Sequence, residues 1–282
     1  MNILTNVELL LYATLLFTPP LLVAALGCCF STTSGIVNIG LDGLMTVGAF
    51  VGCASTYFLQ NSALGLLFAG IISAIFSIIF AIFVLKFHTD EILVGFVLNI
   101  FLPALVVIVS YSLFNSTDTP ALPADLKIPI PLTAAIALIL VVISSFIIKK
   151  TNIGLYIRAC GSNKRAALYV GINREKLQFF CILLSGFLCG IGGAFITMAV
   201  TNQFRTASIT GQGYVALAAV LFGNANPYAI MICCIIFGFF SGLKIIIPAN
   251  SAIVHLIQTL PYIATIIILI IHYGRNKKTS KK

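Results

Sequence analysis

Hydrophobic residues along this chain fall into long runs that are separated by short polar segments. Most runs have about 20 residues, the length that an α-helix needs to cross the hydrocarbon core of a bilayer. The pattern therefore predicts membrane-spanning helices rather than a water-soluble core. The runs are Leu9–Phe30, Leu41–Phe58, Ala63–Leu85, Ile92–Leu113, Ile130–Ile148, Leu177–Val200, Tyr228–Ile247 and Ala252–His272, with a shorter run at Tyr214–Phe222.

The composition supports the same fold class. Of the 282 residues, 60% are hydrophobic and 8% are charged. In soluble domains, about half of the residues are hydrophobic and about a quarter are charged. A helix satisfies its own backbone hydrogen bonds in lipid. We predict an all-α, polytopic transmembrane bundle of about 8–10 spans, forming a single domain over residues 1–282.

The basic residues that give the net charge of +9 flank the hydrophobic runs. Seven lie in the loop 149–176 and five in the tail 275–282. Lys and Arg are enriched in cytoplasmic loops, so both segments are predicted to lie in the cytoplasm. The predicted membrane is the bacterial inner (plasma) membrane. No nucleic-acid partner is expected. Because the loop and the tail lie on the same side of the membrane, an even number of crossings must separate them. Only three long runs follow Lys176. The region Ala207–Gly223 is therefore predicted to supply a fourth, irregular crossing.

Two glycine-rich segments interrupt the hydrophobic pattern, one in each half of the chain. The first runs from Ser34 to Gly52, where residues 31–40 could be re-entrant, and the second from Ile209 to Gly223. In transporters, paired interruptions of this kind point to the substrate path, because unwound backbone is tolerated where it lines a cavity. The alternative is that the glycines only permit close helix packing.

Two polar residues near these interruptions have more than one interpretation. Asp42 is either a cavity or gate residue or the N-terminal cap of the helix that follows it. Asn99 lies four residues before Pro103, which frees a backbone carbonyl, so it either repairs that kink or contacts substrate.

Several kinds of chemistry have no support in the sequence. The eight cysteines lack metal-site or disulfide spacing and are interpreted as packing residues. No catalytic or metal-binding residues are predicted. No phosphate-binding GxxxxGK[ST] motif occurs, so the chain itself is expected to hold no cofactor, and any ATP must be bound by a partner.

The loop after Gly161 is predicted to form a short amphipathic helix that ends at Gly171. It either rests on anionic lipid or couples the spans to a motor subunit. Its paired small residues followed by glycine, Ala166, Ala167 and Gly171, are similar to the coupling segment of ABC-importer permeases.

Further blocks resemble the branched-chain amino acid, sugar and nucleoside permease family, and its nucleoside branch most. They cover most of the chain in family order. They are Asn38–Met45 with Gly48–Gly52, Asp90–Ile92, Leu98–Asn99, Ser185–Ala194, Gly211–Gly223 and Asn226–Pro227. The nucleoside branch commonly has Glu where this chain has Asp42, and Met where it has Leu44.

The resemblance implies the permease subunit of an ABC importer, a transport subunit and not an enzyme, which imports nucleosides by ATP-driven alternating access. Branched-chain amino acids or sugars are the alternative substrates, and an ion-coupled secondary transporter is the alternative class. The implied partners are a second, homologous permease, an ATP-binding cassette ATPase and an extracytoplasmic substrate-binding lipoprotein. The family's functional positions correspond to Asn38, Asp42, Asn99 and Gln212 in the substrate path and to Lys164, Arg165, Ala166, Ala167 and Gly171 in coupling.

Overall fold

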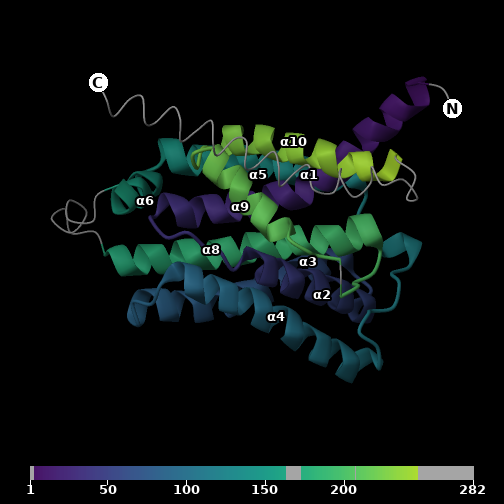
Figure 1. The fold of residues 1–282 in the computed structure, drawn as a ribbon, viewed down its shortest axis with the longest axis horizontal. Coiled ribbons are helices and arrows are strands. Elements are labelled where there is room, and N and C mark those ends of the chain that lie inside the picture. Colours follow the sequence, from purple (N-terminus) through teal and green to yellow (C-terminus); the bar gives the residue numbers. More distant parts are fainter. Residues whose placement is uncertain (1–2, 163–172, 207, 247–282) are drawn as a thin grey trace.

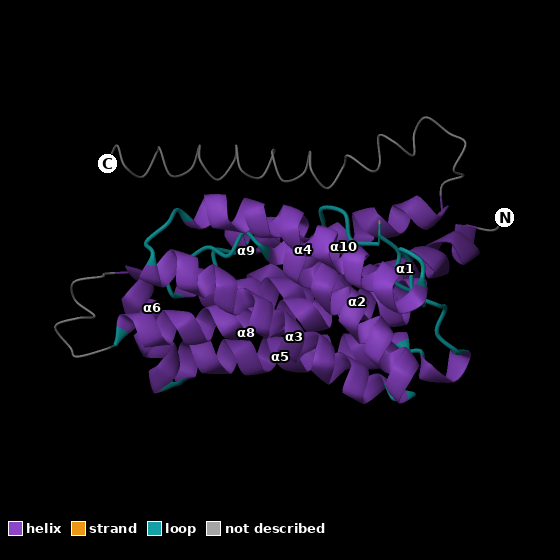
Figure 2. Cartoon of the chain, turned by 90° about the horizontal axis from the view of Figure 1, so that it is seen from below, coloured by secondary structure: helices purple, strands orange, loops and turns teal. Residues whose placement is uncertain are grey.

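The computed structural model describes residues 3–162, 173–206 and 208–246, and within them the chain is helical with no strand (Figure 2). The fold class predicted from the hydrophobic runs is thus confirmed. The helices are α1 (Ile3–Thr33), α2 (Leu41–Leu59), α3 (Ser62–Ala81), α4 (Glu91–Phe114), α5 (Ile130–Lys150), α6 (Asn152–Ser162), α8 (Arg174–Phe195), α9 (Gln212–Phe222) and α10 (Pro227–Ile246), and π-helical turns extend α3 over Ile82–Lys86 and α8 over Ile196–Thr201.

Most helices run along the long axis of the molecule, so the bundle has two ends (Figure 1). We call the end where α6 finishes and α8 begins the basic-loop end. The other, the opposite end, holds the connection 115–129 between α4 and α5. Five helices in the described ranges are long and apolar enough to cross a membrane. Helix α6 was not predicted, because it lies in the polar loop outside the hydrophobic runs.

Helix α8 lies at the centre of the bundle and packs against α1, α2 and α3. Small residues allow this close packing, as they do in many membrane helix pairs. A Cβ atom on Gly48 of α2 would overlap the backbone of Gly190 on α8, and a Cβ on Gly193 would overlap the carbonyl of Met45. Gly48, in the first interrupted segment, therefore does serve helix packing.

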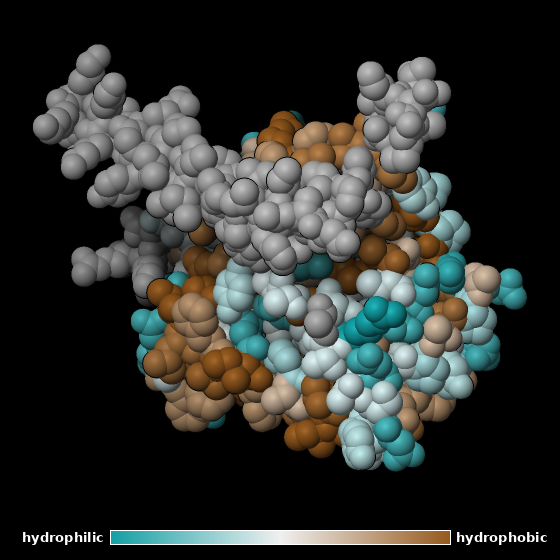
Figure 3. Space-filling view, turned by 45° about the vertical axis from the view of Figure 1, so that its right-hand side comes forward, coloured by the Kyte–Doolittle hydropathy of each residue, from teal (hydrophilic) through white to brown (hydrophobic). Residues whose placement is uncertain are grey.

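The outer surface has the character expected for contact with lipid. Helices α4 and α5 carry large hydrophobic side chains that face outward, such as Ile100, which is 75% exposed, and Phe146. In Figure 3, which brings the opposite end forward, polar side chains gather on that end and hydrophobic ones flank them. Exposed residues there include Asn115, Asp125 and Arg205. This distribution suits a bilayer, where hydrophobic side chains face the lipid and polar side chains at the ends face water.

The region after α8 crosses the bundle in an irregular way. At the opposite end, the carbonyl of Asn202 accepts a hydrogen bond from the backbone of Leu122 (2.8 Å). Gly211 reaches the start of α2, and after α9 the carbonyl of Ala225 meets the thiol of Cys29, near the end of α1 (3.1 Å). In Figure 1, α9 slants across the other helices. This is the irregular crossing that the charge distribution predicted.

The segment between α1 and α2 was expected to be possibly re-entrant, and this was wrong. Gly35 lies against Gly161 at the basic-loop end. From there residues 36–40 continue into the bundle without regular secondary structure, and α2 carries on toward the opposite end. The segment is the unwound part of a single crossing, because α2 resumes the direction of travel instead of turning back.

Candidate functional site

The two interrupted segments meet inside the bundle. We call residues 34–40 the first break and residues 202–211 the second break. Helix α2 starts at the end of the first break and runs toward the opposite end, whereas α9 starts at the end of the second and runs toward the basic-loop end. Their N-terminal turns touch: a Cβ on Gly213 would overlap the backbone nitrogen and Cα of Asp42. We call the group Asp42, Asn99, Gly211, Gly213 and Tyr214 the junction.

Asp42 joins the two breaks through its carboxylate. Its Oδ1 accepts a hydrogen bond from the backbone N–H of Gly213 (2.8 Å), and its Oδ2 accepts one from Gly211 (3.3 Å). Gly211 is the N-cap residue of α9, and it provides no side-chain hydrogen bond to cap the helix. The prediction that Asp42 caps a helix was therefore right about the chemistry but wrong about the helix: Asp42 caps α9, not the start of its own helix α2.

Asn99 connects the junction to α4. Its amide oxygen accepts a hydrogen bond from the N–H of Gly43 in the first turn of α2 (2.9 Å). Its amide nitrogen donates to the carbonyl of Ile39 (2.8 Å) and to the hydroxyl of Tyr214 on α9 (2.9 Å). Both amide hydrogens are used in this way. Asn99 therefore does not donate to the carbonyl freed by Pro103, and the kink-repair interpretation is wrong.

Side chains from α4 and α8 also form hydrogen bonds with residues of the first break. Glu91 accepts from the N–H of Val37 (3.0 Å), and Gln178 donates to the carbonyl of Ser34 (2.8 Å). Asn38 donates to the hydroxyl of Ser185 (3.2 Å) and accepts from the N–H of Gly40 (3.1 Å). Unwound backbone survives at membrane depth only when such partners exist.

The second break is held mainly by the connection between α4 and α5. The hydroxyl of Thr119 accepts from the N–H of Phe204 (2.9 Å), and the backbone N–H of Thr119 donates to the carbonyl of Phe204 (3.1 Å). Asp118 accepts from the N–H of Thr206 (3.2 Å). This break thus depends on a surface loop at one side and on Asp42 at the other.

The residues predicted for the substrate path differ in accessibility. Asp42, Asn99 and Gln212 are partly exposed, as is Tyr214, so the junction opens toward the surface of the chain. Asn38 is fully buried, so in this conformation it supports the first break. The coupling residues Lys164, Arg165, Ala166, Ala167 and Gly171 lie outside the described residues, and their role stays a prediction.

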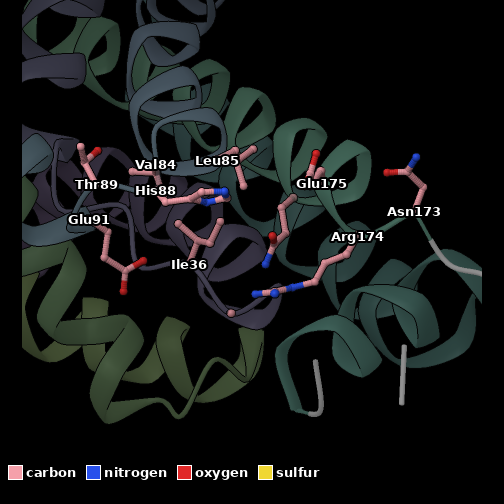
Figure 4. A pocket seen from close by; sticks show the side chains of 11 residues that line it. Ile36, Val84, Leu85, His88, Thr89, Glu91, Asn173, Arg174 and Glu175 are labelled. Carbon is pink, nitrogen blue, oxygen red and sulfur yellow. The ribbon is translucent and has the colours of Figure 1, made fainter. Parts of the chain in front are cut away.

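A cleft of about 690 Å³ opens at the basic-loop end. His88, Glu91 and Arg174 line it from the α3–α4 turn, α4 and α8 respectively (Figure 4). Gly35 and Ile36 of the first break form part of its wall. The first break therefore borders this cleft at its start and reaches the junction at its other end, where the carbonyl of Ile39 accepts a hydrogen bond from Asn99.

Sequence reasoning missed several residues that hold the site. Tyr214, Gln178, Ser185 and Thr119 were not singled out, and Glu91 was attributed to the electrostatics of its own helix start. Four of them reach across to a break that is distant in sequence, whereas Tyr214 reaches from the second break to Asn99 on α4. Tyr214 alone carried a signal, because it follows the Gly211-Gln-Gly213 interruption directly.

Comparison with known proteins decides the family. The model of the family "Branched-chain amino acid transport system / permease component" matches residues 10–271. The chain belongs to this family. It is therefore a permease, the membrane component of a transport system with further subunits, and not an enzyme. Together with the hydrophobic helices, membership makes it a multi-pass protein of the inner membrane.

Individual relatives are similar over nearly the whole chain. The nucleoside ABC transporter permease protein NupC of Lactococcus lactis is 31% identical over 98% of this chain and 95% of its own length. The guanosine ABC transporter permease protein NupQ of Bacillus subtilis is 33% identical over the same shares. The ribose import permease protein RbsC of Haemophilus influenzae is 35% identical over 36% of this chain and 30% of its own length.

Proposed function

We propose that this chain is a permease subunit of an ABC importer that moves nucleosides into the cell. The observation that carries the proposal is the similarity to two relatives named for nucleoside and guanosine transport over nearly the full length of both chains. The similarity to sugar permeases is weaker: the ribose permease matches about a third of the chain, and a putative glucose ABC transporter permease is 24% identical over 84% of it. Nucleosides are therefore favoured over sugars and branched-chain amino acids.

The junction suggests how the permease works. Two broken crossings that enter from opposite ends and meet at their helix N-termini are typical of transporters that alternate access around a central site. The proposed path passes the partly exposed side chains of Asp42, Asn99 and Gln212, and Asn38 positions the first break beside it. The bonds through Asp42 and Asn99 connect both breaks, so movement of one would shift the other.

The energy for transport is assigned to partner subunits. The chain has no phosphate-binding GxxxxGK[ST] motif, so ATP is bound by an ATP-binding cassette partner and this chain needs no cofactor. Contact with that partner is assigned to Lys164, Arg165, Ala166, Ala167 and Gly171. A second, homologous permease and an extracytoplasmic substrate-binding lipoprotein complete the proposed importer.

Uptake of labelled guanosine, ribose and leucine in cells that lack this chain tests the proposal. We expect guanosine uptake to be lost and to return when the chain is supplied again. Loss of leucine or ribose uptake with normal guanosine uptake would contradict the nucleoside assignment.

The coupling assignment has its own test. Ala167→Glu, or a bulky residue in place of Gly171, is expected to uncouple ATP hydrolysis from uptake while membrane insertion stays normal. Normal transport in both variants would remove these residues from the proposed interface.

A further inference from the structure

We infer that Asp42 fills an anion seat at the junction, and that the transport path is consequently closed to solutes that present a carboxylate or phosphate there. The inference rests on the proposal that the chain imports a small solute. It adds the charge class of that solute and assigns the selection to one residue.

The seat is formed by the first turn of α9. This helix has 11 residues, and its free N–H groups and dipole make its N-terminus favourable for negative charge. In transporters built on broken helices, such termini point at the anionic group of the substrate. Here the N–H groups of Gly211 and Gly213 are the donors that a substrate carboxylate or phosphate would use.

A side chain of the protein already occupies this place. Both oxygens of Asp42 accept backbone hydrogen bonds from the seat (2.8 and 3.3 Å), as an ionised carboxylate does. Asp42 also lies in the first turn of α2, so the positive ends of two helices converge on one carboxylate. The backbone of Gly213 packs directly on that of Asp42, which holds the start of α2 against the seat.

The filled seat determines what the path can bind. A solute carboxylate or phosphate would meet a fixed negative charge in place of free donors, and like charges repel strongly away from bulk water. The other partly exposed side chains around Asp42 are the amides of Asn99 and Gln212 and the hydroxyl of Tyr214. These neutral groups suit the hydroxyls and amides of a nucleoside or sugar better than the α-carboxylate of an amino acid.

Chemical rescue tests whether Asp42 acts as the occupant of a seat. Asp42→Ala removes the carboxylate and leaves space for formate, a free carboxylate of similar size. We expect this variant to lower uptake of the labelled solute about tenfold, since two charge-assisted hydrogen bonds are lost. Formate at tens of millimolar should restore most of that uptake, and Asp42→Glu should retain more activity than Asp42→Ala.

Asp118→Ala is the matched control. Asp118 also accepts a backbone hydrogen bond from the second break, but at the exposed surface and not at a helix N-terminus. We expect no response of this variant to formate. The thermal unfolding midpoint of the purified proteins gives a second measurement: formate should raise it in Asp42→Ala by several degrees and leave the original protein unchanged. Equal responses in Asp42→Ala and Asp118→Ala, or none in either, would overturn the inference.

The identity of the transported solute separates this inference from the proposed function. If deletion of the chain abolishes ribose uptake and spares guanosine uptake, the nucleoside assignment fails while selection against anionic groups stands. If leucine uptake is the one that is lost, the path carries a carboxylate and the inference is wrong, whatever formate does.

Discussion

Both breaks contain unwound backbone whose polar groups need hydrogen-bond partners, but the two breaks find these partners in different parts of the molecule. In the first break, buried or half-buried side chains of α4 and α8 pair with the backbone, among them Gln178, Ser185 and Glu91. In the second break, the partners at the opposite end belong to a surface connection, and Arg205 and Thr206 are exposed. Phe204 and its partner Thr119 are buried, but a smaller share of the described residues is buried in the second break than in the first, so the second break should open at lower free-energy cost. The difference suggests that the first break is a fixed support and the second a moving part.

The largest expected effect comes from separating the breaks at the junction. Gly213→Ala places a Cβ against the backbone of Asp42. Overpacking of this kind costs about 1–3 kcal/mol, and we expect uptake of labelled guanosine to fall about tenfold or more, after correction for the amount of protein in the membrane.

Gly40→Ala is the control for this substitution. At Gly40 the nearest atom to a new Cβ is the Asn38 amide oxygen at 3.4 Å, an ordinary contact. Uptake should stay within about twofold of the original protein, since substitutions without such a clash change stability by about 0.5 kcal/mol or less. Equal losses in both variants would show that the two helix starts do not depend on close approach at Gly213.

The next effect concerns Asn99, which contacts both sides of the junction. Asn99→Leu leaves the N–H of Gly43 and the carbonyl of Ile39 without this partner, and each such loss costs about 1–3 kcal/mol. We expect a marked fall in the thermal unfolding midpoint. Tyr214→Phe removes a single bond and should cost about 1 kcal/mol. A double variant that is no worse than Asn99→Leu would confirm that the two residues act through one contact.

A smaller effect is expected for the support of the first break. Gln178→Leu removes the donor to the buried carbonyl of Ser34 and should lower stability by about 1–2 kcal/mol. The change in unfolding midpoint measures this cost. Stability equal to that of the original protein would argue that the first break is not held by its side-chain partners.

The smallest effect is expected at the surface of the second break. Asp118→Asn keeps an oxygen that can accept from Thr206, at an exposed position, and should change stability by about 0.5 kcal/mol or less. A loss as large as that of Gln178→Leu would reverse the comparison, because it would make the second break the more firmly held of the two.

The sequence by itself determined the long apolar helices, their membrane environment and the places where they are interrupted. Runs of about 20 apolar residues have one low-energy solution in a bilayer, so spans such as 92–113 and 130–148 matched α4 and α5 within two residues. The need for an even number of crossings was enough to predict the irregular passage after α8. The paired glycine segments marked both breaks, since glycine interruptions are visible without any knowledge of partners.

Only the tertiary structure decided which groups meet. Whether Asp42 caps α2 or α9, and whether Asn99 serves Pro103 or the junction, depends on contacts between residues 56 to 171 positions apart. Local periodicity carries no information about such contacts. A buried polar group needs a partner, but its type does not say which helix supplies that partner. The packing of α2, α4, α8 and α9 makes that choice, because it sets which backbone groups lie within hydrogen-bond distance of each side chain.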